Sequence, residues 1–288
     1  MTWEETIQYI RTQPEYKYLV EKAYFEEDLH LNVERFKISE EFIETLMLVK
    51  QYQPNAKTIL DIGSGNGVSA IAFALEGYTV FVVEPDPSLT IGAGAIRKLK
   101  ERYHLNNIEI FEAFAEEIKF PNNHFDVVYA RQCMHHAYDL NKFVFEAGRV
   151  LKKDGLFMTV RDHVIFDQKD KEWFLRAHLL QKYYGGENAF TLSEYKTAID
   201  KAGLSLTLTL NHFDTAINYF PLSKAEKETE EKNYKLKLDA AITDKFGFFS
   251  RLNFLKSYFA GKMSQIVENP HDERKIAGRM YTFVALKK

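Results

Sequence analysis

Apolar residues recur along the chain with two different periods, which separate the expected helices from the expected strands. The first 50 or so residues follow helical spacing, most clearly at Phe42, Ile43, Leu46, Met47 and Val49. Ser39 precedes this run and is a residue type preferred as a helix N-cap. Gln53-Pro54-Asn55 then interrupts the pattern, so we expect a helical N-terminal segment that ends before residue 57.

Short apolar runs follow and predict strands. The first five are Thr58–Ile62, Thr79–Val83, Ile108–Phe111, Phe125–Ala130 and Leu156–Val160. Helical stretches separate them, most clearly Asn141–Leu151, which Lys152-Lys153-Asp154-Gly155 brings to an end. Such alternation is typical of α/β proteins with a mostly parallel sheet covered on both faces. We therefore predict a doubly wound α/β fold.

The pattern is less regular after the fifth strand. A helix is expected around Trp173, and the spacing Thr191-Leu192-Ser193-Glu194 resembles a capping box that starts another. The next predicted strand is Leu204–Leu210, and the last is Met280–Leu286. Between these two strands, residues of about 221–275 form a charged, helix-rich insertion.

Composition narrows the range of partners. Among 288 residues, Lys and Arg total 38 against 41 Asp and Glu, so the formal net charge is −3. This balance argues against nucleic acid and anionic membranes as partners. Cys133 is the single cysteine, which excludes an intrachain disulfide and suits a reducing compartment. With an acidic start and no apolar run of the ~20 residues that a membrane helix needs, the chain is expected to be cytoplasmic.

A glycine-rich turn carries the most specific chemical signal. The first strand runs into Gly63-Ser64-Gly65-Asn66-Gly67, where glycines permit positive φ and leave backbone N–H groups open to a ligand. Asp61, just before the turn, repels a pyrophosphate but attracts a cationic group. Val68 stands where the dinucleotide fingerprint requires its third glycine. The turn therefore disfavours a nicotinamide cofactor.

The second strand ends in Glu84, followed by Pro85. An acid in this position accepts hydrogen bonds from ribose hydroxyls. With D-x-G-x-G-x-G and a following strand that ends in an acid, the sequence resembles the class I S-adenosylmethionine-dependent methyltransferases, in their small-molecule, methyltransferase-domain-11-like branch. The resemblance implies a Rossmann-like seven-stranded sheet whose last strand runs antiparallel between the fifth and sixth strands.

The resemblance also implies S-adenosylmethionine as the cofactor and a set of residues around it. Phe114 stands where the family commonly has an acid for adenine. This leaves the Ala115 backbone N–H as one adenine contact, with either Glu116 or Phe114 covering the ring. The expected cofactor-binding residues are Asp61, Gly63, Ser64, Gly65, Gly67, Glu84, Pro85, Ala115, Glu116 and Arg131.

The same resemblance suggests how the chain is divided. Residues 1–56 are expected to form a helical N-terminal lid, and residues 57–162 the cofactor-binding core. Residues 163–203 are expected to form a lid or substrate insertion. Residues 204–288 supply the remaining core strands, with the helical insertion at about 221–275.

Histidines follow the fourth strand, where ligands of open α/β sheets bind. His135 and His136 are the candidate catalytic bases, since imidazole removes protons near neutral pH. Asp162 and His163 follow the fifth strand at the same sheet edge. A later loop has the mixture of aromatic and polar side chains that is typical of binding loops, at Tyr183, Tyr184, Glu187 and Asn188. The expected substrate-binding residues are His163, Tyr183, Tyr184 and Asn188. No metal site is expected, because the adjacent histidines lack ligand spacing and no C-x-x-C exists.

We interpret the chain as an S-adenosylmethionine-dependent methyltransferase that modifies a small molecule by in-line displacement in a lidded pocket. One alternative is an NAD(P)-dependent oxidoreductase, and another is a non-catalytic S-adenosylmethionine-binding module. Methylation of nucleic acid or protein is disfavoured, because the sequence lacks the N/D-P-P-Y/F signature of enzymes that carry it out. The acceptor and the oligomeric state are left open by the sequence.

Overall fold

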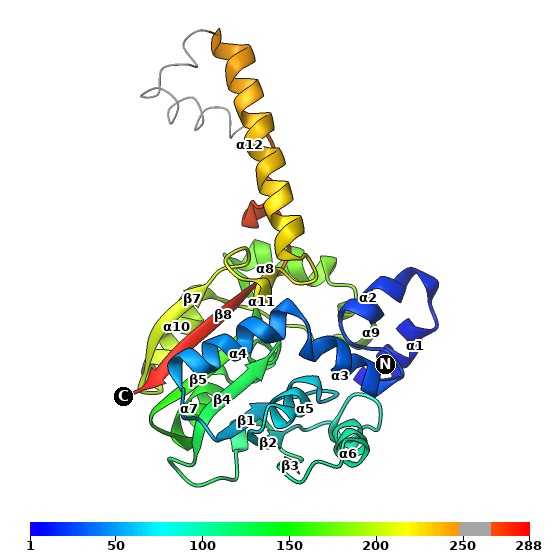
Figure 1. Ribbon diagram of the computed structural model, residues 1–288, viewed down its shortest axis with the longest axis vertical. Helices are drawn as coiled ribbons and strands as arrows, with labels where there is room; N and C mark the ends of the chain where they lie inside the picture. Colours follow the sequence, from blue (N-terminus) through cyan, green and yellow to red (C-terminus); the bar gives the residue numbers. More distant parts are fainter. Residues whose placement is uncertain (248–265) are drawn as a thin grey trace. The chain divides into compact units, whose positions relative to one another are not determined.

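The computed structural model describes residues 1–247 and 266–288. Contacts divide the chain into two units, one formed by Met1–Tyr219 with Ala277–Lys288 and the other by Phe220–Ile276. The first unit holds the sheet (Figure 1). The predicted helical insertion at about 221–275 includes residues 248–265, which lie outside the described residues.

The described part of the first unit forms one eight-stranded sheet in the order β3-β2-β1-β4-β5-β8-β7, with β6 paired to β5. The pairs among β1 to β5 are parallel, and β8 runs antiparallel to both β5 and β7. The strands are β1 (Thr58–Ile62), β2 (Thr79–Val83), β3 (Ile108–Phe111), β4 (Phe125–Arg131), β5 (Leu151–Ile165), β6 (Phe190–Thr191), β7 (Leu204–Leu210) and β8 (Arg279–Lys287). The predicted doubly wound, mostly parallel sheet is confirmed, including the antiparallel last strand.

Strand β5 is the main departure from the predicted elements. It spans Leu151–Ile165 rather than Leu156–Val160, because it pairs with β4 on one edge and continues alongside β8 as far as Val164. The prediction that Asp162 and His163 follow this strand is therefore wrong, since both lie inside it. The two-residue strand β6, parallel to the end of β5, was not predicted either.

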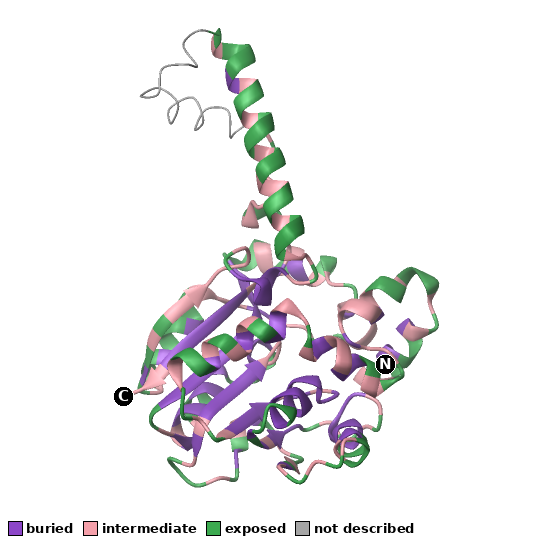
Figure 2. Cartoon of the chain, in the orientation of Figure 1, coloured by how far each residue is buried: buried purple, intermediate pink, exposed green. Residues whose placement is uncertain are grey.

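Helices cover both faces of the sheet. Residues of α7 (Leu140–Val150) and α10 (Leu192–Lys201) share a buried cluster with Leu60 and Val128 on one face. On the other face, Phe73 of α5 (Val68–Leu75) packs against Tyr129, with ring centroids 5.1 Å apart. Figure 2 shows that the strands between these layers are buried. The remaining helices of this unit are α1 (Trp3–Arg11), α2 (Lys17–Lys22), α3 (Leu29–Lys37), α4 (Glu40–Tyr52), α6 (Ala93–Arg102), α8 (Gln168–Ala177), α9 (Gln181–Tyr184) and α11 (Ala216–Tyr219).

Two helix starts form as their residue types predict. The Ser39 side chain accepts a hydrogen bond from Phe42 N at the start of α4. At the start of α10, Thr191 and Glu194 form a reciprocal capping box. Both caps satisfy N–H groups that have no partner within the helix.

The N-terminal helices pack against the segment that follows β5. Ile7, Ile10 and Val20 share an apolar cluster with Leu180, beside α9. The rings of Trp3 and Tyr184 lie 4.8 Å apart, and the hydroxyls of Tyr16 and Tyr183 are 2.8 Å apart. Two stretches that are more than 150 residues apart in the sequence therefore form one covering layer.

The second unit is organised around α12 (Lys224–Phe246), which begins with a capping box between Ser223 and Glu226. His271 Nε2 lies 3.0 Å from Glu230 Oε2, which ties the end of this unit back to the helix. None of the helices within the described ranges combines the length and the apolar character needed to cross a membrane.

Asp126 joins three segments at the amino end of the sheet. Its Oδ2 accepts hydrogen bonds from Lys57 N and Thr58 N, each 2.9 Å long, and its Oδ1 accepts one of 2.7 Å from Lys152. Partial burial alone raises the pKa of Asp126, but these hydrogen bonds outweigh burial and lower the pKa to about 2.

We expect Asp126→Ala to lower the free energy of unfolding by about 2–3 kcal/mol at neutral pH, as measured by urea denaturation. Asp126→Asn, which keeps one acceptor oxygen, should lose less. Because the native pKa lies below the unfolded value, the carboxylate stabilises fully above about pH 5 and progressively less toward pH 2. The difference in unfolding free energy between wild type and Asp126→Ala should therefore shrink as the pH falls from about 5 to 2. A difference that stays constant contradicts the stabilising role assigned to the Asp126 carboxylate.

Candidate functional site

The glycine turn connects β1 to α5, and its backbone requires glycine. Gly63, Gly65 and Gly67 have φ values of +63°, +56° and +85°. A Cβ on Gly63 would lie 2.1 Å from Cys133 Sγ, which comes from the loop after β4. A Cβ on Gly65 meets no atom closer than Ile91 O at 3.8 Å. The turn is therefore packed tightly against the loop after β4 at Gly63 but is open at Gly65.

Asp61 lies beneath this turn with no exposed surface. Its Oδ2 accepts hydrogen bonds from Ser64 Oγ at 2.8 Å and Ser69 Oγ at 2.7 Å. Its Oδ1 is buried and has no hydrogen-bond partner among the described residues. Burial raises the pKa of Asp61 to about 6 despite the opposing serine hydrogen bonds. A buried carboxylate oxygen thus remains available to a donor or a cation.

Glu84 connects the turn to the segment after β2. Its Oε2 accepts a hydrogen bond from Gly65 N at 2.7 Å, and its Oε1 accepts one from Asp86 N at 2.9 Å. Each carboxylate oxygen keeps a further lone pair for a ligand donor. Burial raises the pKa of Glu84 to about 7, while the two backbone hydrogen bonds oppose this shift. The neighbouring Pro85 continues the loop.

The segment after β3 holds the residues expected near adenine. Ala115 is buried at the start of the short helix η2 (Ala115–Glu117), whereas Phe114 is 52% exposed. Glu116 Oε1 accepts a hydrogen bond of 3.0 Å from Tyr138 N. Glu116 therefore fastens this loop to the one after β4, and its expected contact with adenine stays a prediction.

Arg131, at the end of β4, is paired with an acid from the N-terminal helices. Its Nε and NH2 atoms lie 2.6 and 3.1 Å from the two carboxylate oxygens of Glu41, which has no exposed surface. The guanidinium also packs against Tyr24 and Phe36 at 5.6 and 5.3 Å from their ring centroids. Arg131 is thus already paired with Glu41, and its expected role in cofactor binding stays a prediction.

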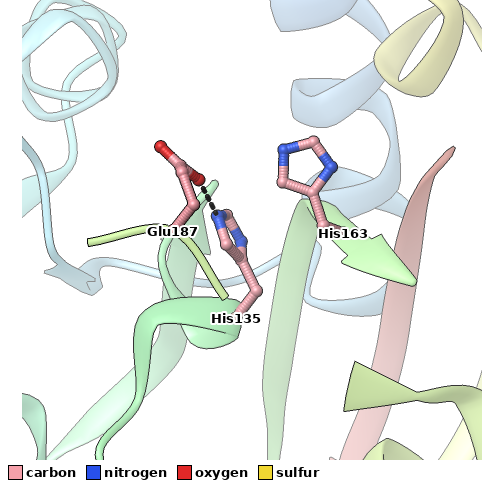
Figure 3. Close-up of side chains that lie close together, drawn as sticks. All are labelled: His135, His163 and Glu187. Atoms are coloured by element: carbon pink, nitrogen blue, oxygen red, sulfur yellow. Dashed lines mark ion pairs between the residues drawn. The ribbon is translucent and has the colours of Figure 1, made fainter. Parts of the chain in front are cut away.

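A second group of ionisable side chains lies at the ends of β4 and β5 (Figure 3). His135 Nδ1 is 3.0 Å from Asp162 Oδ1, and His135 Nε2 is 4.0 Å from Glu187 Oε2. His163 Nδ1 lies 2.6 Å from the carbonyl oxygen of Gly278. The ring centroids of His135 and His163 are 4.7 Å apart. Residues distant in sequence thus meet beside the glycine turn.

Burial disfavours charge throughout this group. It lowers the pKa of His135 well below its ordinary value and that of His163 to about 3. It raises the pKa of Asp162 and of Glu187, each to about 7. All these groups are nearly inaccessible: the side chains of His135, Asp162 and Glu187 are 2%, 0% and 5% exposed.

The other expected site residues lie around this group. His136 Nδ1 is 3.0 Å from Gly186 O, so His136 holds the loop that carries Glu187. Tyr183 and Tyr184 contact the N-terminal helices. Asn188 is partly buried next to Glu187. The sequence did not single out Asp162 as the partner of His135, or Glu41 as the partner of Arg131, because no local spacing links them.

Comparison with protein families gives one match that covers most of the chain. The profile described as "Methyltransferase domain" matches residues 34–209. This stretch includes strands β1 to β6 and all of β7 except its last residue, and with them Asp61, Glu84, His135, His163 and Glu187.

Individual relatives agree with this match. YcgJ of Bacillus subtilis, named an uncharacterized methyltransferase, is 34% identical over 105 residues, which is 36% of this chain and 40% of that protein. A ubiquinone/menaquinone biosynthesis C-methyltransferase, UbiE of Vibrio vulnificus, is 27% identical over 130 residues, 43% of this chain and 49% of the relative. The matched stretches thus span less than half of either curated relative.

Solved structures share the fold. The crystal structure of YcgJ superimposes with a TM-score of 0.53 at 20% identity, covering 84% of this chain and 97% of that one. A geranyl diphosphate methyltransferase in complex with S-adenosylmethionine gives 0.54 at 13% identity, covering 85% and 84%. Both are α/β proteins of the Rossmann-like methyltransferase type.

Gly63→Ala should destabilise the protein for two reasons. It forces a non-glycine residue into the left-handed region, which costs about 1–2 kcal/mol of folding free energy, and it drives the new Cβ into Cys133 Sγ. Removing that sulfur with Cys133→Ala should reduce the cost. We expect the double variant to be about 0.5–3 kcal/mol more stable than the sum of the single effects, by urea denaturation of all four proteins. Simple additivity would show that the turn and the loop after β4 are not in contact.

Proposed function

The chain belongs to the methyltransferase-domain family, and from this premise we propose that it transfers a methyl group from S-adenosylmethionine to a small-molecule acceptor. Family membership makes it an S-adenosylmethionine-dependent methyltransferase. The nature of the acceptor and the roles of individual residues belong to the proposal. The observation that carries it is the pair of buried acids, Asp61 and Glu84, on either side of an open glycine turn.

The chain's own residues fit this cofactor. Glu84 keeps a free lone pair on each oxygen, which suits two ribose hydroxyls. Asp61 Oδ1, buried without a hydrogen-bond partner among the described residues, suits the positively charged methionine part. Gly65 leaves space for close approach, and the Ala115 backbone N–H is the donor that we propose for adenine. When bound, S-adenosylmethionine supplies a sulfonium methyl group that a nucleophile displaces in line.

His135 is the acceptor-side group that we propose acts in the reaction. Asp162 accepts from its Nδ1–H and so fixes the tautomer that leaves a lone pair on Nε2. That lone pair faces the Glu187 carboxylate across 4.0 Å. Asp162 also accepts from the backbone N–H of His135 at 3.0 Å, which holds the loop in place. His136 then serves to position the loop around Gly186 rather than to transfer a proton.

Two features support a small acceptor. The site is lined by groups that are almost completely buried, and the balanced charge of the chain offers no strong attraction to a polyanion. The names of UbiE and of geranyl diphosphate methyltransferase refer to small molecules. The N-terminal helices and the α9 segment pack together, which suits them to act as a lid that excludes water during transfer.

Glu84→Ala should weaken binding of S-adenosylmethionine by about 1–3 kcal/mol, because two ribose hydrogen bonds are lost. Isothermal titration calorimetry measures this directly. Glu112→Ala is the matched control, since Glu112 follows the neighbouring strand and forms an exposed ion pair with Arg97. Unchanged affinity in Glu84→Ala, or tight binding of NAD by the wild type, would contradict the cofactor assignment.

His135→Ala should reduce turnover about a hundredfold or more, while affinity for S-adenosylmethionine stays within about threefold of wild type. Turnover is followed as S-adenosylhomocysteine formed in the presence of a panel of small acceptors. His30→Ala, in the N-terminal helix α3, serves as the control. If the His135 variant retains full turnover with an accepted substrate, the residue has no part in the reaction.

A further inference from the structure

Three potential metal ligands converge where the ends of β4 and β5 meet the loop after α9. His135 lies in the short helix η3 (Met134–His136), His163 in β5, and Glu187 in the loop. One ligand atom from each lies within 4.8 Å of the other two. Figure 3 shows His135 and Glu187 pointing toward one another, with His163 beside them.

The outer contacts of both histidines are those of metal ligands. Ligating imidazoles typically donate the N–H of their second nitrogen to a carboxylate or a backbone carbonyl, which fixes the tautomer. Here His135 Nδ1 lies 3.0 Å from Asp162, and His163 Nδ1 lies 2.6 Å from Gly278 O. Donation from these two nitrogens leaves the Nε2 lone pair of each ring free to bind an ion.

The three groups do not satisfy one another directly. The 4.0 Å between His135 Nε2 and Glu187 Oε2 is too long for a hydrogen bond. The other oxygen of Glu187 lies 3.4 Å from His178 Nδ1, a buried nitrogen without a hydrogen-bond partner among the described residues. Polar atoms are thus held apart around a common point instead of being paired, in a region where unsatisfied polar groups are costly.

The donor set selects a class of ion. Two imidazoles and one carboxylate are typical of open Zn²⁺ and Fe²⁺ sites, whereas Mg²⁺ and Ca²⁺ prefer oxygen ligands only. Ligands bound at ~2.1 Å lie about 3–3.5 Å from one another. The widest of the present separations, at most 4.8 Å, therefore has to shorten by about 1.3–1.8 Å, and we expect the Glu187 and His163 side chains to shift when the ion binds.

We propose that His135, His163 and Glu187 bind a divalent first-row transition metal ion, of the Zn²⁺ type, at the acceptor side of the site. Asp162 and Gly278 orient the two imidazoles from outside the coordination shell. The positive ion balances the buried Asp162 and Glu187 carboxylates. This site goes beyond the family assignment and is not implied by the cofactor.

A role in methyl transfer follows if the proposed function holds. A protein-bound Zn²⁺ lowers the pKa of an attached hydroxyl or thiol. The acceptor loses its proton to solvent and attacks the methyl carbon, and the bond from sulfur to the methyl group breaks as the new bond forms. The ion keeps its oxidation state. His135 then acts in the reaction by holding the ion rather than by removing the proton itself.

The test uses the full chain, freed of metal by a chelator and carrying no affinity tag. Zn²⁺ affinity is measured by competition with a chromophoric chelator, and Co²⁺ is added as a probe whose visible absorption reports nitrogen and oxygen coordination. We expect stoichiometric binding of both ions and none of Mg²⁺ at the same concentration. Absence of Zn²⁺ and Co²⁺ binding overturns the proposal.

Variants locate the ion. Glu187→Gln preserves the shape of the side chain and is expected to weaken Zn²⁺ binding at least tenfold, while Asp162→Asn weakens it about 10–100-fold. His30→Ala should bind as the wild type does. Circular dichroism confirms that each variant is folded. If Glu187→Gln and His163→Gln both bind Zn²⁺ as tightly as the wild type, the ion lies elsewhere and the assignment is overturned.

Calorimetry with S-adenosylmethionine on the same samples separates this inference from the proposed function. Binding of S-adenosylmethionine without binding of Zn²⁺ contradicts only the metal site. Binding of Zn²⁺ that Glu187→Gln weakens, without binding of S-adenosylmethionine, supports the metal site and contradicts the proposed function.

Discussion

Desolvation of acidic side chains at one edge of the sheet is the constraint on which the site depends. Asp61, Glu84, Asp162 and Glu187 are all buried near the carboxyl ends of the parallel strands, and burial raises the pKa of each carboxyl group. Backbone N–H groups, serines and the His135 imidazole satisfy part of the hydrogen-bonding capacity of Asp61, Glu84 and Asp162. Buried charge is stable only when it is paired. The site is therefore prepared for ligands that bring positive charge or hydrogen-bond donors.

The fold brings these acids together through the order of its central strands. β1 lies between β2 and β4, and β5 lies beside β4, so the carboxyl ends of four neighbouring parallel strands share one edge. Contact between Gly63 and Cys133 joins the turn after β1 to the loop that carries His135. Glu41 and Arg131 attach the N-terminal helices to the same edge through a nearly buried ion pair. The proposed cofactor-binding residues and the proposed acceptor-side residues are consequently parts of one packed assembly.

Local sequence determined much of this arrangement. Strands β1, β2, β3 and β7 begin and end where their apolar runs do, because short buried strands leave a clear pattern. The start of β5 was missed because Lys152 to Asp154 have the charges of a helix end, although Leu151 pairs with β4. Its end was missed because the residues after Val160 pair with β8. The meeting of His135, His163 and Glu187 was not predicted, since they lie up to 52 residues apart and only the tertiary fold unites them. Periodicity thus located the elements but not the long-range contacts between them.

The most direct test of the account is a crystal structure of the protein grown with S-adenosylhomocysteine and Zn²⁺, with diffraction data collected at the zinc absorption edge. The account predicts ribose hydroxyls against the Glu84 carboxylate and an anomalous peak enclosed by His135, His163 and Glu187. Nucleoside density away from Glu84, together with no peak among those three side chains, would contradict the claim that the buried acids exist to receive these ligands.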